Sequence, residues 1–298
     1  MRTVFLGTSE FAVAVLERLA ESEHRPLLAL TRPDRPRGRG RKLAAPPLAR
    51  AARTLGIELE QPERVNEAPA RARIAEREPE AVIVCAYGAL IREPLLSDYE
   101  LLNVHPSLLP RWRGAAPVER AIMAGDASTG VSIMRLTAGL DSGPVCLAEA
   151  EPIAAEDTYG SLAPRLAALG GELLVRVLDR IAAGEAPAFA EQDESGATYA
   201  EKITAEDRLL DPRRSAIELE RVVRALAPHI GARLALEGEL LGVREARALA
   251  RAVTVGELER AGERLLLGTA EGALELLVVQ PPGGRPMDVA AYLRGHAR

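Results

Sequence analysis

The sequence predicts an α/β protein, with a doubly wound parallel sheet in its N-terminal part and a small β-barrel in its C-terminal part. Short apolar runs alternate with amphipathic helical segments over the first half of the chain. Short strand-like runs separated by Gly and Pro dominate the end, and a stretch without periodicity lies between the two parts. Because 298 residues exceed what one hydrophobic core usually holds, we expect two domains.

In the N-terminal part, apolar runs and helical runs take turns along the chain. We expect strands at Thr3–Leu6, Pro26–Leu30, Ile57–Leu59, Ala81–Ala86 and Leu101–Val104. Helical spacing of apolar residues places helices between them, at Glu10–Glu21, Leu48–Leu55, Val65–Glu76 and Pro94–Leu96. This alternation is typical of a parallel sheet covered by helices, with the active site at the carboxyl ends of the strands.

The rest of the chain contains longer elements and then a break. We expect a helix from Ala115 to Ala124, strands at Gly130–Leu136 and Val145–Ile153, and a long amphipathic helix at Leu162–Ala183. Residues 185–205 are rich in Ala, Pro, Gly, Ser and charge, which indicates a linker between domains at 1–184 and 206–298. Beyond it, we expect a helix at Ile217–Ala227. Four barrel strands follow, at Arg233–Leu236, Leu240–Val243, Arg264–Leu267 and Leu274–Gln280.

The composition limits the classes of function. A formal net charge of -5 argues against a protein that coats nucleic acid generally, so any binding to a polyanion must be local. The N-terminus runs into a strand rather than a signal peptide, and no apolar run is long enough for a membrane helix, so we expect a cytoplasmic protein. The two cysteines, Cys85 and Cys146, lack the spacing of metal ligands, and we expect no metal site.

Two polar side chains stand where a predicted strand ends, in the segment Asn103-Val104-His105-Pro106-Ser107. Asn103 and His105 are two residues apart, so both project from the same face of an extended chain. An amide and an imidazole side by side suit the negative oxygen of a tetrahedral intermediate. Such a pair taken alone is more often structural.

A single carboxylate follows a later strand. Asp141 lies in a turn flanked by Gly139, Gly143 and Pro144, and the glycines let the backbone approach a ligand closely. Taken alone, Asp141 would be interpreted as an ordinary aspartate in a turn. The combination of this carboxylate with the amide and imidazole side chains changes the interpretation and indicates catalysis.

The Asn-x-His pair and the later Leu-Asp-x-Gly resemble the signature of the folate-dependent formyltransferase family. The resemblance covers nearly the whole chain. It includes the stretches VFLGTSEFA (4–12), TRPDRPRGRGRK (31–42) and NVHPSLLPRWRGAAP (103–117), which are similar to members that act on methionyl-tRNA. The sequence departs from the family pattern at Ser9 and at residues 135–138. The resemblance implies a Rossmann-like N-terminal domain, an OB-like C-terminal barrel that helps to hold tRNA, and 10-formyltetrahydrofolate as co-substrate.

The reaction implied is attack by the amino group of initiator methionyl-tRNA on the formyl carbon, with expulsion of tetrahydrofolate. We assign Asn103 and a protonated His105 to the oxyanion. Asp141 would keep His105 charged and help to handle the proton of the amine. The resemblance places the folate along a further set of residues, namely Ser107, Leu108, Leu109, Pro110, Tyr87 and Gly88.

Residues 31–42, called the basic arm below, carry most of the local positive charge. Six basic residues face one acid there, and clustered Arg with Gly and Pro suits phosphate groups. Because the resemblance extends to this arm, we expect it to contact the acceptor end of tRNA, through Arg35, Arg39, Arg41 and Lys42. We assign Arg39 as the leading contact and expect the protein to act as a monomer.

Four other interpretations remain open. The same three catalytic residues could formylate another amine, such as a purine-pathway ribotide or an amino sugar nucleotide, and water in place of the amine would give hydrolysis of the folate. A nucleic-acid-binding module would not need Asn103, His105 and Asp141. A dinucleotide oxidoreductase is suggested by the glycine after the first strand, but Gly7-Thr8-Ser9-Glu10 lacks the G-x-G-x-x-G pattern.

Overall fold

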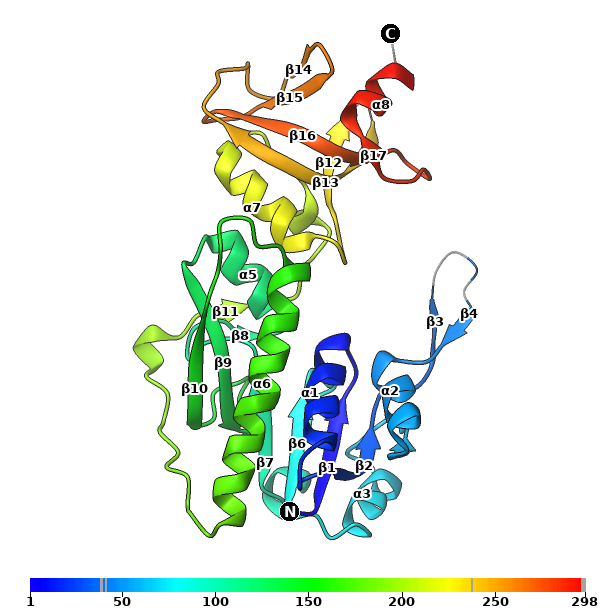
Figure 1. Cartoon of the computed structure of the whole chain (residues 1–298), viewed down its shortest axis with the longest axis vertical. Coiled ribbons are helices and arrows are strands. Elements are labelled where there is room, and N and C mark those ends of the chain that lie inside the picture. The colour runs from blue at the N-terminus through cyan, green and yellow to red at the C-terminus, as the bar shows by residue number, and fades with distance from the viewer. Residues whose placement is uncertain (38–39, 41, 237, 296–298) are drawn as a thin grey trace. The chain divides into compact units, whose positions relative to one another are not determined.

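In the described part of the chain, a seven-stranded sheet forms the centre of the N-terminal half, in the order β10-β9-β7-β6-β1-β2-β5 (Figure 1). The computed structural model describes residues 1–37, 40, 42–236 and 238–295. The strands are β1 (Thr3–Gly7), β2 (Pro26–Leu30), β5 (Glu58–Glu60), β6 (Ala81–Cys85), β7 (Leu101–His105), β9 (Ser128–Arg135) and β10 (Val145–Pro152). The five neighbouring strands β7, β6, β1, β2 and β5 are parallel, and β9 is antiparallel to β7.

The chain divides into two units, each assembled from three stretches of sequence. The first unit contains Met1–Gly114, Thr129–Glu151 and Ala163–Tyr199. The second contains Ala115–Ser128, Pro152–Leu162 and Ala200–Arg298. The central sheet therefore belongs to the first unit, and its last two strands come from sequence beyond a segment of the second.

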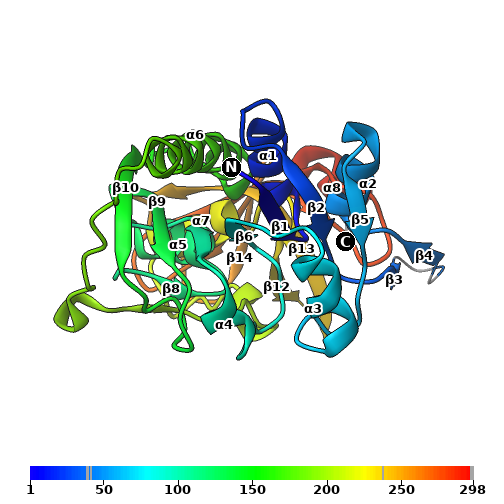
Figure 2. The same cartoon turned by 90° about the horizontal axis from the view of Figure 1, so that it is seen from below.

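Both faces of the central sheet are covered, which explains why its parallel strands are continuous apolar runs. On one face, residues such as Val4 and Val82 form a buried cluster with Ile74 of helix α3 (Ala68–Ala75). On the other face lie α1 (Glu10–Ala20) and α6 (Tyr159–Ala182), as Figure 2 shows. Gly170 allows α6 to come close, since a Cβ there would lie 2.8 Å from Cγ1 of Val104.

Local signals explain where several helices begin and end. The Ser9 hydroxyl accepts a hydrogen bond from the Ala12 amide and caps α1, so the departure from the family pattern at this position is accommodated by an N-cap. Helix α3 begins at Ala68, later than the expected Val65, because Pro69 fits only the first turn of a helix. The remaining short elements of this unit are α2 (Pro47–Leu55), α4 (Leu95–Asp98), the hairpin β3 (Arg35–Arg37) and β4 (Lys42–Ala44), and β8 (Arg113–Gly114).

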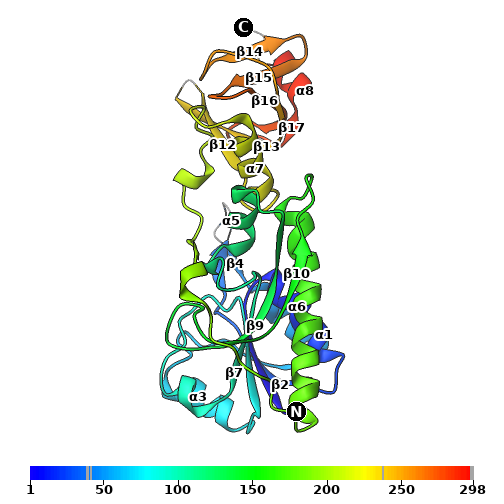
Figure 3. The ribbon, with the colours of Figure 1, turned by 90° about the vertical axis from the view of Figure 1, so that its left-hand side faces the viewer.

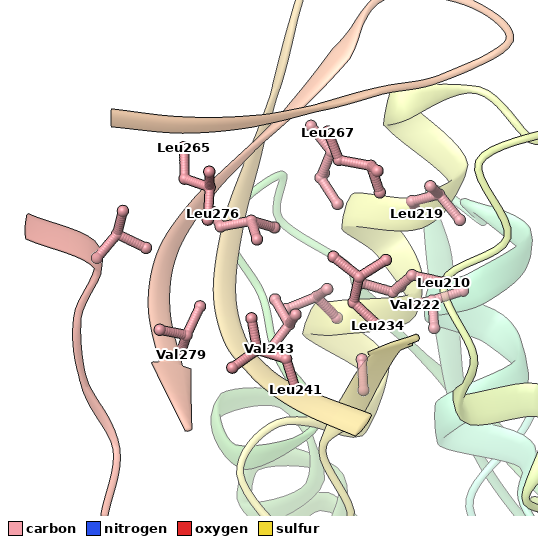
Figure 4. Close-up of a cluster of buried hydrophobic side chains, with 14 of the residues drawn as sticks. Leu210, Leu219, Val222, Leu234, Leu241, Val243, Leu265, Leu267, Leu276 and Val279 are labelled. Carbon is pink, nitrogen blue, oxygen red and sulfur yellow. The ribbon is translucent and has the colours of Figure 1, made fainter. Parts of the chain in front are cut away.

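The second unit is built on an antiparallel sheet in the order β12-β13-β16-β15-β14, with β17 on β16. Helix α7 covers one face of this sheet (Figure 3), and Leu219 and Val222 of α7 meet Val243 and Leu276 in a buried core (Figure 4). The elements are α5 (Pro117–Ala124), α7 (Ala216–Leu226), β12 (Ala232–Leu236), β13 (Glu239–Leu249), β14 (Leu258–Ala261), β15 (Arg264–Gly268), β16 (Ala273–Gln280), β17 (Met287–Asp288) and α8 (Val289–Gly295).

The predicted fold class is confirmed: a Rossmann-like, mainly parallel sheet with helices precedes a C-terminal antiparallel domain. Residues 185–205, expected as a linker, contain short regular pieces, which are a bridge from Ala190 to Val145, a 3-10 turn at Glu194–Gly196 and strand β11 (Tyr199–Ala200). As far as Tyr199 they belong to the first unit. The boundaries at 184 and 206 stay a prediction.

Candidate active site

Asn103 and His105 lie at the carboxyl end of β7, in the middle of the central sheet. Asn103 stands opposite Val84 of β6 on one side and Met134 of β9 on the other. Both residues are buried: Asn103 is 7% exposed and His105 is 4% exposed. Within the described residues, the amide group of Asn103 makes no hydrogen bond to the protein. This amide is therefore available to a ligand.

The protein fixes the orientation of the His105 ring. Its Nε2 lies 2.9 Å from the carbonyl oxygen of Trp112, and because a carbonyl only accepts, Nε2 must carry a hydrogen. Nδ1 is then the nitrogen whose protonation can change. It lies 3.6 Å from Oδ2 of Asp141, which is an ion-pair distance when the ring is charged but is longer than a hydrogen bond.

Asp141 is held by the backbone on the other side of the site. Its Oδ2 accepts a hydrogen bond of 2.8 Å from the Gly114 amide. The residue adopts a φ of 45°, in the left-handed region where a non-glycine residue is strained, and such strain concentrates at functional sites. No described residue donates a hydrogen bond to its second carboxylate oxygen, which therefore remains free to accept a proton or to bind a water molecule.

The arrangement brings together three groups with different chemical abilities. The amide of Asn103 can donate a neutral hydrogen bond, His105 can donate from Nδ1, and Asp141 can accept. Two donors near one carboxylate, in a largely buried site, match an acyl transfer in which an oxyanion develops while an amine loses a proton. The structure thus brings the three predicted catalytic residues to one place, whereas their roles stay a prediction.

The turn after β6 forms another part of this edge. Ala86 has a φ of 44° and Gly88 a φ of 75°, so the chain turns sharply directly after the strand. The Tyr87 ring is buried, which raises the pKa of its hydroxyl group, and the carbonyl of Tyr87 accepts a hydrogen bond of 2.7 Å from Thr8. The loops after β1 and β6 are joined in this way.

The predicted folate segment 107–110 packs against β9, which supports it. Ser107 is fully buried, its hydroxyl donates to the carbonyl of Arg111, and its own carbonyl accepts from Ser132. Its side chain therefore supports the loop, while Leu108, Leu109 and Pro110 are partly exposed. Gly130 leaves room for this loop, since a Cβ there would lie 2.6 Å from Cδ2 of Leu108.

The atypical stretch 135–138 begins with a well-held residue. Nε of Arg135 donates a hydrogen bond of 2.8 Å to Glu100, and its guanidinium lies 4.1 Å from the ring centroid of Phe189. The side chain of Arg135 is therefore held by contacts within the protein.

The described part of the basic arm contributes to two short antiparallel strands, which pair from Arg35 opposite Ala44 to Arg37 opposite Lys42. Lys42 is exposed, and Arg35 forms an ion pair of 2.8 Å with the equally exposed Glu63. Such a surface pair is weak, so a phosphate can replace the carboxylate. Arg39 and Arg41 lie outside the described residues.

Sequence reasoning missed a pocket in the first unit, with a volume of about 500 Å³. It lies beside the turn after β6 and carries three arginines from three separate loops. The lining residues are Arg32, Glu63, Arg64, Val65, Asn66, Glu67, Ala89 and Arg92. The signal that could have found it is the presence of an arginine within a few residues of the end of β2, β5 and β6, because those ends meet at one edge of the sheet.

Among residues 1–37, 40, 42–236 and 238–295, no group of three or more His, Cys, Asp or Glu side chains is arranged to hold a metal ion. Over the same ranges, none of the helices combines the length and the apolar character needed to cross a membrane.

Comparison with known proteins extends the picture to the whole chain. Residues 1–178 match the family model described as Formyl transferase, and residues 202–297 match the model for its C-terminal domain. The methionyl-tRNA formyltransferase of Halorhodospira halophila is 46% identical to this chain over 301 residues. That similarity covers 99% of this chain and 96% of the relative.

Solved structures with lower identity share the fold. HypX from Aquifex aeolicus in complex with tetrahydrofolic acid gives a TM-score of 0.68 at 18% identity. The match covers 98% of this chain but only 47% of HypX, so this chain spans about half of that protein. An N-formyltransferase from Helicobacter canadensis, in complex with folinic acid and dTDP-3-aminofucose, gives a TM-score of 0.69 at 14% identity, covering 93% of this chain and 98% of that one.

Proposed function

The chain belongs to the formyl transferase family, and from this premise we propose that it transfers the formyl group of 10-formyltetrahydrofolate to the amino group of methionyl-tRNA. Its relatives support this acceptor, because proteins named methionyl-tRNA formyltransferase are 39–46% identical over nearly its full length. The product, formylmethionyl-tRNA, serves the initiation of translation. We place the reaction in the cytoplasm, where this tRNA is used.

The observation that carries the proposal is the distance of 3.6 Å between Nδ1 of His105 and Oδ2 of Asp141 at the carboxyl end of β7, beside the amide of Asn103. In the proposed reaction, the amine nitrogen bonds to the formyl carbon. The formyl oxygen becomes an oxyanion, to which Asn103 and Nδ1 of His105 donate hydrogen bonds. Collapse of this intermediate breaks the bond between the formyl carbon and N10 of the folate.

The proton balance assigns a role to Asp141. The attacking amine must lose a proton, and N10 of the departing folate must gain one. The second oxygen of Asp141 can accept the proton and return it to N10, directly or through a water molecule. Its first oxygen stays on the Gly114 amide, which keeps the carboxylate oriented during the transfer.

We propose that the three-arginine pocket receives the tail of the folate. The glutamate tail of a folate is anionic, and Arg32, Arg64 and Arg92 line this pocket beside the turn that carries Tyr87 and Gly88. Guanidinium groups bind carboxylates well, often through two hydrogen bonds. Glu63 and Glu67 offset part of the positive charge of the pocket. The pocket therefore favours the folate tail, which needs few contacts, over a strongly anionic ligand.

We propose that the acceptor is held by the basic arm and that one copy of the chain suffices. Arg35 and Lys42 are exposed on the arm, and Arg39 and Arg41 belong to the same run of sequence. The three catalytic side chains come from a single chain, so the proposed chemistry needs no second subunit. The alternative acceptor, an amino sugar nucleotide, is bound in a structure that shares the fold at 14% identity.

A single-turnover experiment tests the acceptor. The protein is mixed with 10-formyltetrahydrofolate and either methionyl-tRNA or dTDP-3-aminofucose, and the formylated product is quantified over time. We expect a formylated product with methionyl-tRNA and none with dTDP-3-aminofucose. Lys42→Ala should weaken tRNA binding and flatten its salt dependence, because one phosphate contact is lost.

The matched control is Arg176→Ala, which removes an exposed arginine that forms an ion pair with Glu149 elsewhere in the first unit. It should leave the use of tRNA unchanged. Formylation of the amino sugar without formylation of the tRNA would show that the acceptor is wrong while the chemistry is right. If Lys42→Ala bound both substrates as tightly as the wild type, Lys42 would be excluded as a tRNA contact.

A further inference from the structure

The segment after α6 returns to the candidate active site. Ala190 and Val145 exchange two backbone hydrogen bonds of 2.9 Å. Further along, the carbonyl of Thr198 accepts from the Arg113 amide at 2.9 Å, and its hydroxyl accepts from the Trp112 amide at 2.9 Å. Residues 190–198 are therefore held at both ends, and Gln192 lies between the two attachments.

The side chain of Gln192 joins two parts of the site. Its Nε2 donates to the carbonyl oxygens of Asp141, at 2.8 Å, and Gly143, at 2.6 Å. Its Oε1 accepts from Nε of Arg113 at 2.9 Å. Both donor hydrogens of the amide and its oxygen are in use, so its orientation is fixed.

Arg113 completes the frame from the other side. Its side chain is almost fully buried and forms two hydrogen bonds with Glu194, of 3.0 and 2.8 Å. The residue before it, Trp112, supplies the carbonyl that holds His105, and the residue after it, Gly114, supplies the amide that holds the Asp141 carboxylate. The peptide around Arg113 thus contacts both catalytic side chains.

We propose that Gln192 is a positioning residue, which sets the place of Asp141 relative to His105 by tying the backbone of the Asp141 turn to Arg113. This inference rests on the proposed function, since it assigns Gln192 a role in that same reaction. The positive φ of Asp141 costs free energy for a non-glycine residue, and the hydrogen bonds from Gln192 to the carbonyls of Asp141 and Gly143 offset that cost. No group of Gln192 needs to touch either substrate.

The test compares Gln192→Glu and Gln192→Met with the wild type in single-turnover formyl transfer at saturating substrates. Both variants keep the length of the side chain and remove the two donors to the Asp141 turn. We expect the rate constant to fall about 10- to 100-fold, as for a catalytic group displaced by a fraction of an ångström to 1 Å, while KM for folate and for tRNA stays within about twofold. The pH dependence of the rate should shift, since the distance between Asp141 and His105 changes.

A double-mutant cycle separates positioning from general structural damage. If Gln192 acts through Asp141, then Gln192→Glu should slow the Asp141→Asn protein by less than about threefold, because the group it positions has already lost its charge. Gln280→Glu is the matched control: Gln280 also accepts from an arginine Nε and donates to a backbone carbonyl, but in the second unit. It should change neither the rate nor the pH profile.

Four outcomes would overturn the inference. Losses that multiply in the double mutant would show that Gln192 acts independently of Asp141. A loss confined to KM, or an unchanged pH profile together with a lowered melting temperature, would show a purely structural role. If the wild type consumes 10-formyltetrahydrofolate but formylates no methionyl-tRNA, the proposed function fails first, whereas an active wild type with unaffected Gln192 variants refutes the positioning role alone.

Discussion

Replacing Asp141 by asparagine removes one charge from the site and, with it, the proposed acceptor of the amine proton. Asparagine has nearly the same shape, and its oxygen can still accept the 2.8 Å hydrogen bond from the Gly114 amide. What disappears is the negative charge 3.6 Å from Nδ1 of His105. We therefore expect Asp141→Asn to fold normally and to lose activity by at least the electrostatic amount that follows from this distance.

The distance gives the size of the effect. At 3.6 Å, two unit charges interact by about 4 to 5 kcal/mol with an effective dielectric constant near 20, and by about 1 kcal/mol in bulk water. The side chain of Asp141 is 15% exposed and that of His105 is 5% exposed, so the effective value lies between these limits. A loss of about 2 to 3 kcal/mol from the transition state corresponds to a rate about 30- to 150-fold lower.

The assay is quench-flow formation of formylmethionyl-tRNA under single-turnover conditions, with KM values measured in parallel. The control is Asp179→Asn, because Asp179 lies 2.8 Å from Nε2 of His24 and forms a second aspartate–histidine pair, away from the site. It should be as fast as the wild type. A rate for Asp141→Asn within about twofold of the wild type, with both proteins folded, would refute the electrostatic role.

Three further predictions follow from other parts of the structure. Gly130→Ala should destabilise the protein by about 1 to 3 kcal/mol and raise KM for folate, because the new Cβ would collide with the carbonyl oxygen of Glu149 and lie 2.6 Å from Cδ2 of Leu108; thermal unfolding and steady-state kinetics measure both effects, and an unchanged melting temperature would contradict the close contact. Arg92→Ala should raise KM for the folate and leave the rate at saturation unchanged, and the opposite pattern would remove the pocket from the folate site. A hydrogen bond from Nε of Arg264 keeps the pKa of Glu275 below its usual range, so this carboxylate stabilises the fold above about pH 4 and loses that contribution as acid protonates it. Urea unfolding of the wild type and Glu275→Gln should therefore differ most near neutral pH and converge below about pH 4, and a constant difference would contradict the pairing.

The sheet of the first unit could be predicted because burial on two faces leaves a clear pattern. The run Ala81–Ala86 is apolar throughout, and the structure has β6 at Ala81–Cys85. The hairpin of β3 and β4 could not be predicted in the same way. Its strands, Arg35–Arg37 and Lys42–Ala44, are short and rich in basic residues, so they carry no apolar alternation from which to predict them.

The same difference separates the parts of the site. Asn103 and His105 could be predicted because they end a strand, where the fold places chemistry. Asp141 could be predicted because it lies in a turn flanked by glycines and completes the signature of the family. Gln192 was assigned to a linker, since a segment held by side chain to backbone hydrogen bonds has no period to detect. The three arginines of the pocket come from separate loops, and only the fold shows that they meet.

The interleaving of the two units limits how such a protein can arise and be made. The chain passes from one unit to the other after residues 114, 128, 151, 162 and 199. Helix α5 packs against α7, and Met123 of α5 joins the core that α7 shares with the C-terminal sheet, so that core draws on sequence synthesised far ahead of it. On the ribosome, α5 must therefore wait for about 90 residues before its partner helix emerges. A gene fusion that exchanged only the last hundred residues would leave α5 without the partner surface it was selected to cover, so we expect recombination between relatives to succeed where α5 and the C-terminal domain are inherited together.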